Sequence, residues 1–292
     1  MSDVRIFDAR TCTLGEGPLW HPRLEQLFWF DIVNGRLLSR RGDETHERDL
    51  GRCVSAAGWI DEATLLIAGE TGLTRLDLAT GAEEMLCPIE ADRPETRSND
   101  GRADPWGGFW VGTMGKAGEA GAGTLYRWYR GELRVLETGL TTPNAICFDR
   151  DRLCAYYTDT KTRQIWRQPL DPGTGWPEGG KAVFLDLSAT PEAPEHKPDG
   201  AVIDAEGCLW SAQWGSARVA RYSPDGAFLS AIDLPTGHTS CPAFGGAGLA
   251  TLFVTSATQK LPEDRPGWQA TAGQTFAVPG AGRGLPEPRV TA

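Results

Sequence analysis

Asn99-Asp100-Gly101, followed by the apolar run Phe109-Trp-Val-Gly-Thr-Met114, is one copy of a pattern that occurs six times and decides the fold. Each copy has an anchor residue, then a turn, then an apolar run that begins 10 or 11 residues after the anchor. The six anchors are Glu16, Val54, Asn99, Asn144, Asp199 and Cys241.

The spacing of the anchors indicates the architecture. Successive anchors are 38, 45, 45, 55 and 42 residues apart, and a third strand-like segment follows each apolar run, as in Gly123-Thr-Leu-Tyr-Arg127. A period of about 40–50 residues that holds several short strands is typical of a β-propeller blade. Six periods fill the chain, so we predict an all-β protein in which residues 1–292 form a single six-bladed β-propeller domain.

The N-terminal segment predicts how the ring closes. Residues 4–9 precede the first anchor, at the place where later copies have an apolar strand, such as residues 133–136 before Asn144. Within a blade that strand is the fourth and outermost. The first copy has no blade in front of it, so we expect residues 4–9 to complete blade six as its outer strand.

Composition excludes several classes of protein. The net charge is −10 and no run of basic residues occurs, which argues against nucleic acid as a partner because phosphate binding needs clustered Lys and Arg. No apolar stretch approaches the ~20 residues of a membrane helix. The seven cysteines are odd in number and lack a Cys-x-x-Cys motif, so we expect reduced thiols in a cytoplasmic protein. A closed propeller has little need of partners, so we expect a monomer.

Four of the anchors predict a metal site. The innermost strands of a propeller all begin at one mouth of the central channel, and Glu16, Asn99, Asn144 and Asp199 offer oxygen atoms there. Two carboxylates buried together repel unless a cation lies between them. This donor set matches one divalent ion, with Ca²⁺, Mg²⁺ and Mn²⁺ preferred and Zn²⁺ or Fe²⁺ open. The alternative is that each polar anchor only hydrogen-bonds a strand end or a neighbouring blade.

Two long loops are expected at the same mouth. They join the second and third strands of blades three and six and cover residues 115–122 and 258–272. Long loops in compact domains are often functional, so we predict a rim or lid over the site. The alternative is a glycine-rich insertion without a role.

The motifs around the anchors resemble those of the SMP-30/gluconolactonase/regucalcin family across nearly the whole chain. They are Gly15-Glu16-Gly17-Pro18, Asn99-Asp100-Gly101, Gly112-Thr113-Met114, Pro143-Asn144 and Pro198-Asp199-Gly200. The resemblance implies a six-bladed propeller that hydrolyses sugar lactones with one divalent metal ion. It also implies that Glu16, Asn144 and Asp199 are the metal ligands, that Asn99 lies beside metal and substrate, and that Arg97 binds the substrate.

Lactone chemistry fits these residues. Hydrolysis of a cyclic ester builds negative charge on the carbonyl oxygen, which a divalent cation can stabilise while it acidifies a water. We expect Asp199 to act as the general base and Glu16 to be a plain ligand. Two alternatives remain open, a metal-dependent hydrolase of phosphotriesters or other esters, and a non-catalytic propeller that binds calcium or a protein.

The loop of blade three departs from the family. Regucalcin-like members have an acidic residue three positions after the Gly-Thr-Met motif, and this chain has Ala117 there. We therefore expect the neighbours Lys116 and Glu119 to contact the substrate instead. Lys116, together with Lys260 and Arg265 of the other loop, raises the hypothesis of a lactone with an acidic group.

Asp31 and Asp159 end second strands at the same mouth. Either could support the metal ligands from behind, or simply accept hydrogen bonds at the end of a strand. The sequence leaves both possibilities open.

Overall fold

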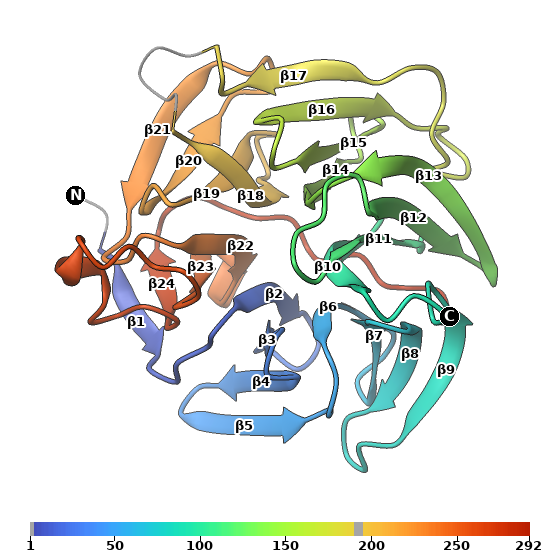
Figure 1. The fold of residues 1–292 in the computed structure, drawn as a ribbon, viewed down its shortest axis with the longest axis horizontal. Coiled ribbons are helices and arrows are strands. Elements are labelled where there is room, and N and C mark those ends of the chain that lie inside the picture. The colour runs from blue at the N-terminus through green and yellow to red at the C-terminus, as the bar shows by residue number, and fades with distance from the viewer. Residues whose placement is uncertain (1–2, 190–194) are drawn as a thin grey trace.

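Six four-stranded antiparallel sheets stand in a ring around a central channel, as Figure 1 shows. The computed structural model describes residues 3–189 and 195–292. This confirms the predicted six-bladed β-propeller. No helix in the described ranges has the length and apolar character that crossing a bilayer requires.

Blades one to five are each built from four strands that follow one another in the chain. Blade one comprises β2 (Gly15–His21), β3 (Gln26–Asp31), β4 (Arg36–Arg41) and β5 (Glu44–Asp49). Blade two comprises β6 (Val54–Trp59), β7 (Thr64–Gly69), β8 (Gly72–Asp77) and β9 (Glu83–Pro88). Blade three comprises β10 (Thr96–Ala103), β11 (Phe109–Gly115), β12 (Gly123–Tyr129) and β13 (Glu132–Leu140). Blade four comprises β14 (Pro143–Asp149), β15 (Cys154–Asp159), β16 (Gln164–Pro169) and β17 (Ala182–Asp186). Blade five comprises β18 (Lys197–Ile203), β19 (Leu209–Trp214), β20 (Arg218–Tyr222) and β21 (Phe228–Asp233).

Blade six joins the two ends of the chain. It contains β22 (Thr239–Gly245), β23 (Thr251–Ser256) and β24 (Thr275–Pro279), with the short 3-10 turns η1 (Ala247–Leu249) and η2 (Pro266–Trp268) in its connections. Its outer strand is β1 (Arg5–Asp8), which pairs antiparallel with β24. The predicted closure of the ring by the N-terminal strand is therefore confirmed.

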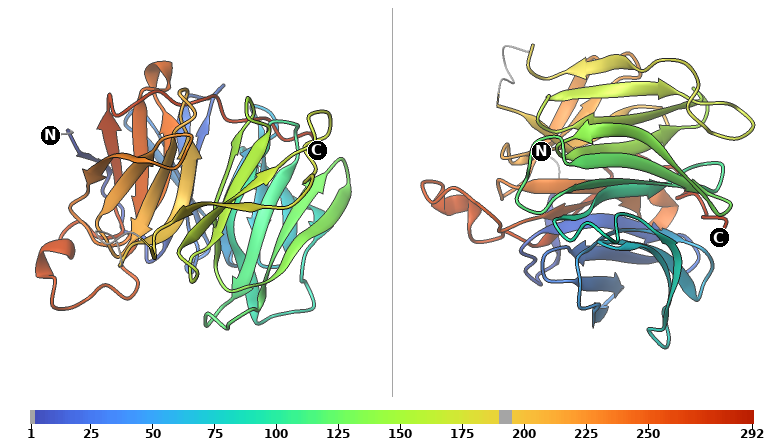
Figure 2. Two further views of the ribbon diagram at one scale, coloured as in Figure 1. Left: turned by 90° about the horizontal axis from the view of Figure 1, so that it is seen from above. Right: turned by 45° about the vertical axis from the view of Figure 1, so that its right-hand side comes forward.

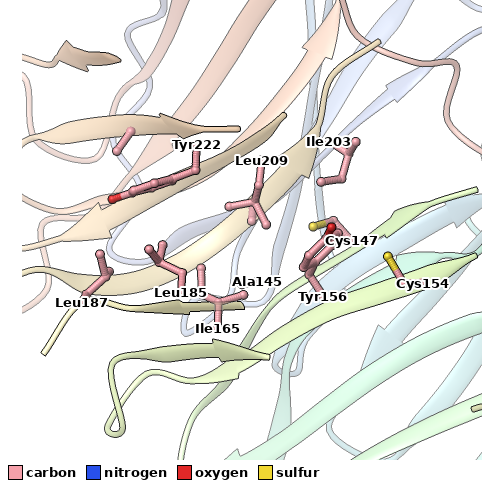
Figure 3. Close-up of a cluster of buried hydrophobic side chains, with 12 residues drawn as sticks. Ala145, Cys147, Cys154, Tyr156, Ile165, Leu185, Leu187, Ile203, Leu209 and Tyr222 are labelled. Carbon is pink, nitrogen blue, oxygen red and sulfur yellow. The ribbon is translucent and has the colours of Figure 1, made fainter. Parts of the chain in front are cut away.

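Packing between neighbouring blades forms the core. Figure 3 shows one such cluster between blades four and five, in which Tyr156 and Ile165 of one blade pack near Leu209 and Tyr222 of the next. The second strands are almost entirely buried, whereas most residues of outer strands such as β5 are exposed. This gradient explains why the apolar runs of the sequence mark the second strands.

Aspartates hold the turns between the first and second strands. The Oδ1 atom of Asp104 accepts hydrogen bonds from the amides of Trp106 and Gly108, at 2.9 and 3.0 Å. Asp204 does the same in blade five. Aspartate is favoured in such turns because its carboxylate satisfies amides that the sheet leaves free.

A β-bulge interrupts each innermost strand near its anchor. The pairing with the second strand shifts between Glu16 and Leu19, and equivalent shifts occur in β6, β10, β14, β18 and β22. Bulges redirect side chains and end regular pairing. They therefore release the anchors from the sheet pattern at the channel mouth.

The C-terminal segment closes the other mouth of the channel. It runs across the ring from blade six, and its amides at Val290 and Thr291 donate to the carbonyls of Trp59 and Gly107. Earlier in this segment the buried Glu287 pairs with Arg102 at 2.6 Å. Figure 2 (left) shows this segment on one side of the ring and the loop with η2 on the other. Ligands must therefore enter from the anchor side.

A substitution of Phe7 on β1 tests how much the closure of the ring contributes to stability. Its ring packs against Phe253 and Trp29, with centroids 4.7 and 6.4 Å away. We expect Phe7→Ala to lower the free energy of unfolding by roughly 2–4 kcal/mol, because it removes a large side chain from this contact. Denaturant unfolding measures the loss.

Ile6 provides the matched control, since it lies on the same strand but is 51% exposed. Ile6→Ala should change the free energy of unfolding by less than about 1 kcal/mol. Equal effects of the two substitutions would contradict the role given to β1.

Candidate functional site

The four oxygen-bearing anchors meet in one cavity at the open mouth of the channel. Glu16, Asn99, Asn144 and Asp199 all line this cavity, whose volume is about 440 Å³. The remaining anchors, Val54 and Cys241, are buried and apolar and do not line it. The sequence therefore predicted the convergence of these four residues.

A chain of hydrogen bonds crosses three blades at the cavity. Arg97 donates to Asn99 Oδ1 at 3.0 Å, and Asn99 Nδ2 donates to Asn144 Oδ1 at 2.9 Å. Asn144 Nδ2 in turn donates to the hydroxyl of Thr160 at 2.9 Å, and this hydroxyl donates to the carbonyl of Pro198 at 2.8 Å. These bonds hold both amide groups in one orientation, so the site is organised before any ligand arrives.

The carboxylates of Asp199 and Glu16 receive few hydrogen bonds from the described residues. Asp199 is only 5% exposed, and no described hydrogen-bond donor reaches its side chain. Glu16 accepts a single bond of 3.3 Å from the amide of Gly17. A buried carboxylate without hydrogen bonds or a counter-ion is unfavourable. Glu16 and Asp199 therefore keep oxygen lone pairs that a cation could bind.

Asp100 is a third carboxylate, which sequence reasoning missed. Its Oδ2 accepts from the amide of Ile146 and its Oδ1 from the amide of Gly101, both at 2.8 Å. It thus ties the bulge of β10 to the bulge of β14, and so supports Asn99 and Asn144. The available signal was its place directly after an anchor.

Burial raises the pKa of all three carboxyl groups, and repulsion from neighbouring carboxylates adds to the shift at Glu16 and Asp199. Burial, reinforced by Asp100, raises the pKa of Glu16 to about 8. Burial also raises the pKa of Asp199 well above its usual value, with further contributions from Glu16 and Asp100. Burial raises the pKa of Asp100 as well. Without a cation, the site therefore holds protons near neutral pH.

Arg97 is the nearby positive charge. Its side chain lies in the cavity wall and is only 7% exposed, and burial lowers its pKa. One nitrogen, Nη1, donates both to Asn99 and to the carbonyl of Ser98. Arg97 attracts Glu16 and Asp199 electrostatically but forms no ion pair with either among the described contacts.

The donor set fits a divalent cation. It offers two carboxylates with free lone pairs and the amide oxygen of Asn144, all lining one cavity. Hard cations such as Ca²⁺ and Mg²⁺ prefer such oxygen ligands. A cation there would also balance two charges that repel each other.

A second acidic group is less suited to a metal. Among the described residues, Asp204, Glu206 and Cys208 bring ligand atoms within 4.8 Å of one another. However, Arg221 already donates to Asp204 at 2.7 Å and to Glu206 at 2.6 Å, and Trp210 donates to Asp204 as well. The guanidinium therefore occupies the place of a cation in this group.

Asp31 and Asp159 act at strand ends. Asp159 accepts from the amides of Thr141 and Thr142, at 2.8 and 3.0 Å, and Asp31 accepts from the two amides that precede β2. Both carboxylates therefore fasten the segment that leads into the innermost strand of their own blade. Of the two possibilities left open by the sequence, strand-end hydrogen bonding is the one these contacts favour.

Both predicted rim loops contribute to the cavity, with different residues than expected. Ala117 and Gly118 of blade three and Gln259 and Lys260 of blade six line it. Of the three basic residues in the anionic-lactone hypothesis, only Lys260 lies in the wall. The guanidinium of Arg265 instead stacks on Trp268, 4.9 Å from the ring centre, outside the lining.

Lys116 and Glu119 do not line the cavity. Lys116 forms an ion pair of 2.5 Å with Glu70 of blade two. Glu119 is exposed and accepts from the amide of Ala117 at 3.2 Å. Their predicted role in substrate binding stays a prediction, and the geometry gives it no support.

Three further basic residues line the cavity without having been predicted. They are Lys161 and Arg163, in the connection between β15 and β16, and Lys197 at the start of β18. Lys197 directly precedes the motif Pro198-Asp199-Gly200, and this position was the available signal.

Comparison with known proteins gives a consistent result. The family model for the "SMP-30/Gluconolactonase/LRE-like region" matches residues 14–258. A putative sugar lactone lactonase of Rhizobium meliloti is 36% identical, over 95% of each chain. A 6-deoxy-6-sulfogluconolactonase of Pseudomonas putida is 34% identical, over 93% of this chain and 94% of that one. The crystal structure of a calcium-binding protein, regucalcin, from Agrobacterium tumefaciens superposes with a TM-score of 0.95 at 36% identity, over 100% of this chain and 98% of that one.

The raised pKa of Glu16 predicts an unusual pH dependence of stability. The folded, metal-free protein binds this proton more tightly than the unfolded chain, whose Glu16 pKa is near 4.5. This group therefore destabilises the fold progressively as pH rises from about 4.5 to about 8. We expect Glu16→Gln to reduce the loss of melting temperature between about pH 5.5 and pH 8 in chelator.

Glu44→Gln is the matched control, because Glu44 is exposed on the outer strand β5. It should leave the pH dependence of the melting temperature as in the wild type. Added Ca²⁺ or Mn²⁺ should raise the wild-type melting temperature most at about pH 8, where the carboxylates are ionised. Identical pH profiles for wild type and Glu16→Gln would contradict the assignment.

Proposed function

The chain belongs to the SMP-30/gluconolactonase/LRE-like family, and we propose on this basis that it is a sugar lactonase that uses one divalent metal ion. Relatives of this family are named lactonases, which hydrolyse cyclic carboxylic esters, and this chain is a hydrolase of that class. The observation that carries the metal is the pair of the half-buried Glu16 and the buried Asp199, which line one cavity and form no ion pair among the described residues.

The reaction opens the lactone ring. The oxygen of a water molecule adds to the carbonyl carbon, the bond between this carbon and the ring oxygen breaks, and the ring oxygen takes a proton. The product is the open-chain hydroxy acid, an aldonic acid when the substrate is an aldonolactone. Negative charge builds on the carbonyl oxygen along the way, so a site that stabilises this charge accelerates the step.

We assign the metal ligands to Glu16, Asn144 and Asp199. When bound there, a divalent ion supplies a Lewis acid that stabilises charge on the carbonyl oxygen and makes a water molecule more acidic. Ca²⁺, Mg²⁺, Mn²⁺, Zn²⁺ and Fe²⁺ all accept these donors. Asn144 is held in position by its bonds with Asn99 and Thr160.

Asp199 is the proposed general base. Its carboxylate is buried, lines the cavity and has no competing hydrogen-bond donor among the described residues. It is therefore free to accept a proton from the attacking water and to release it to the ring oxygen. We assign Glu16 the role of a ligand only, and its Oε2 atom also accepts a bond of 3.3 Å from the amide of Gly17.

Arg97 and Asn99 are the proposed substrate-binding residues. Both lie in the cavity wall, on the same innermost strand, and the bond between them fixes their side chains. The remaining guanidinium nitrogens of Arg97 can donate to sugar hydroxyls or to the ester oxygens. Such donors restrain the lactone so that its carbonyl faces the carboxylates.

A second candidate function is calcium binding without catalysis. It is favoured by the high structural similarity to a protein described as calcium-binding. Calcium would use the same oxygen ligands. All seven cysteines are free thiols, in keeping with the cytoplasmic location that we propose for either function.

Hydrolysis of a panel of aldonolactones, followed with a pH indicator, tests the proposal. We expect metal-stripped protein to be inactive and single divalent ions to restore turnover. Asp199→Asn should lower kcat by roughly 100- to 10,000-fold, the usual range for a lost general base. Asp31→Asn is the control, because Asp31 fastens a strand end and should affect mainly stability.

Three outcomes separate the alternatives. No lactone turnover in protein that binds metal would favour the calcium-binding protein. Faster turnover of phosphotriesters than of lactones would favour a hydrolase of other esters. Full activity of Asp199→Asn would contradict the role of this carboxylate while leaving lactone hydrolysis in place.

A further inference from the structure

Positive charge collects in the cavity wall. Five cationic side chains line the cavity, namely Arg97, Lys161, Arg163, Lys197 and Lys260. Among the described residues the wall contains three carboxylates, and two of these, Glu16 and Asp199, are the proposed metal ligands. The third is Glu195, so the basic residues outnumber the acidic residues that remain for other contacts. This is the reverse of the whole chain, which has 39 acidic and 29 basic residues.

Four of these cations have no ion-pair partner among the residues that the structure describes. Within 4.0 Å, none of Lys161, Arg163, Lys197 and Lys260 approaches a described carboxylate oxygen. Basic residues elsewhere behave differently, since Lys116 pairs with Glu70 and Lys181 pairs with Glu137, both at 2.5 Å. The cavity therefore presents positive charge that no ion pair among residues 3–189 and 195–292 neutralises.

Two of the unpaired cations, Lys161 and Lys197, are close in sequence to residues of the proposed reaction centre. Lys161 follows Thr160, whose hydroxyl accepts from Asn144 and donates to the carbonyl of Pro198. Lys197 directly precedes this proline and lies two residues before Asp199. The same hydrogen bonds that hold the metal ligands thus hold the backbone from which two of the cations extend.

The backbone next to Lys260 is also held in place by hydrogen bonds. The amide of Gln259 donates to the carbonyl of Thr13 at 3.0 Å, and the carbonyl of Gln259 bonds the ring of His238 at 2.9 Å. This ring stacks on Trp214, another residue of the cavity wall, with centroids 4.1 Å apart. The blade-six loop is therefore anchored where it enters the cavity.

The cations define one side of the cavity. Lys161, Arg163, Lys197 and Lys260 come from blades four, five and six, whereas Arg97 and Asn99 come from blade three. A lactone whose ester lies at Glu16, Asn144 and Asp199 would have blade three on one side and the unpaired cations on the other. A charged substituent of the sugar can reach these cations without displacing the ester.

We propose that this subsite binds an anionic group on the substrate, so that the enzyme prefers lactones bearing a carboxylate, sulfonate or phosphate. This inference rests on the proposed lactonase function. Lys and Arg bind all three anions through charge-assisted hydrogen bonds, and they do so most strongly where other charges do not compete. The hydrolysed product then carries two anionic groups, the original anion and the new carboxylate.

Matched substrates test the preference. Gluconolactone is compared with counterparts that carry a carboxylate, a sulfonate or a phosphate at C6. We expect kcat/KM to be at least roughly tenfold higher for an anionic member, which is the effect of one charge-assisted hydrogen bond. The preference should shrink as salt rises from about 0.05 to 0.5 M, because these cations are largely exposed. The best of the three anions identifies the substituent.

Substitutions locate the subsite. Lys197→Gln and Lys161→Gln should each lower the ratio of anionic to neutral kcat/KM by roughly tenfold. Lys181→Gln is the matched control, because Lys181 lies on the outer side of blade four and pairs with Glu137. It should leave the ratio unchanged. Equal rates on neutral and anionic lactones in the wild type would overturn the inference and leave the lactonase function standing.

Calorimetric binding of the open-chain products gives a readout independent of turnover. Gluconate is compared with its anionic C6 counterparts, with and without added metal. Binding of the C6-anionic products that is tighter than that of gluconate, and that is lost in Lys197→Gln, supports the subsite. This holds even if no lactone in the panel is hydrolysed, an outcome that would count against the proposed lactonase function and not against the subsite. Equal binding of gluconate and of its C6-anionic counterparts would overturn the subsite.

Discussion

Burial of carboxyl groups at one channel mouth is the constraint on which this structure depends. When ionised, Glu16, Asp199 and Asp100 each raise the free energy of the folded state, chiefly because burial removes them from water, and repulsion between carboxylates adds to this at Glu16 and Asp199. The fold tolerates them in different ways. Asp100 is satisfied by two backbone amides, whereas the other two face a cavity. The stability of the fold and the chemistry of the site are therefore coupled through whatever cation binds there.

The propeller supplies the conditions for this arrangement. Six innermost strands begin at one mouth, and a bulge near each anchor releases its side chain from the regular sheet pattern. The C-terminal segment closes the opposite mouth through the buried pair Arg102 and Glu287. Closure of the ring by β1 then fixes the distance between blades one and six. A rigid ring with one open end can hold like charges close together where a flexible loop could not.

The repeat made much of this predictable. The spacing of the anchors predicts the blades, and antiparallel pairing within each blade brings Glu16, Asn99, Asn144 and Asp199 to one place. Other features depend on contacts between blades that leave no periodic signal. The pairing of Lys116 with Glu70 joins two blades, and it removes Lys116 from the site that its loop position suggested. The topology places the connection that holds Lys161 and Arg163 at this mouth, but the sequence does not show that both side chains line the cavity.

Diffraction from crystals soaked in Mn²⁺, with the anomalous signal used to locate the ion, tests the central claim most directly. The account predicts one strong peak within coordination distance of Glu16, Asn144 and Asp199, and its loss in Asp199→Asn. A peak at Asp204, Glu206 and Cys208 instead, or no peak at the channel mouth at saturating Mn²⁺, would contradict the view that these buried carboxylates exist to hold a metal.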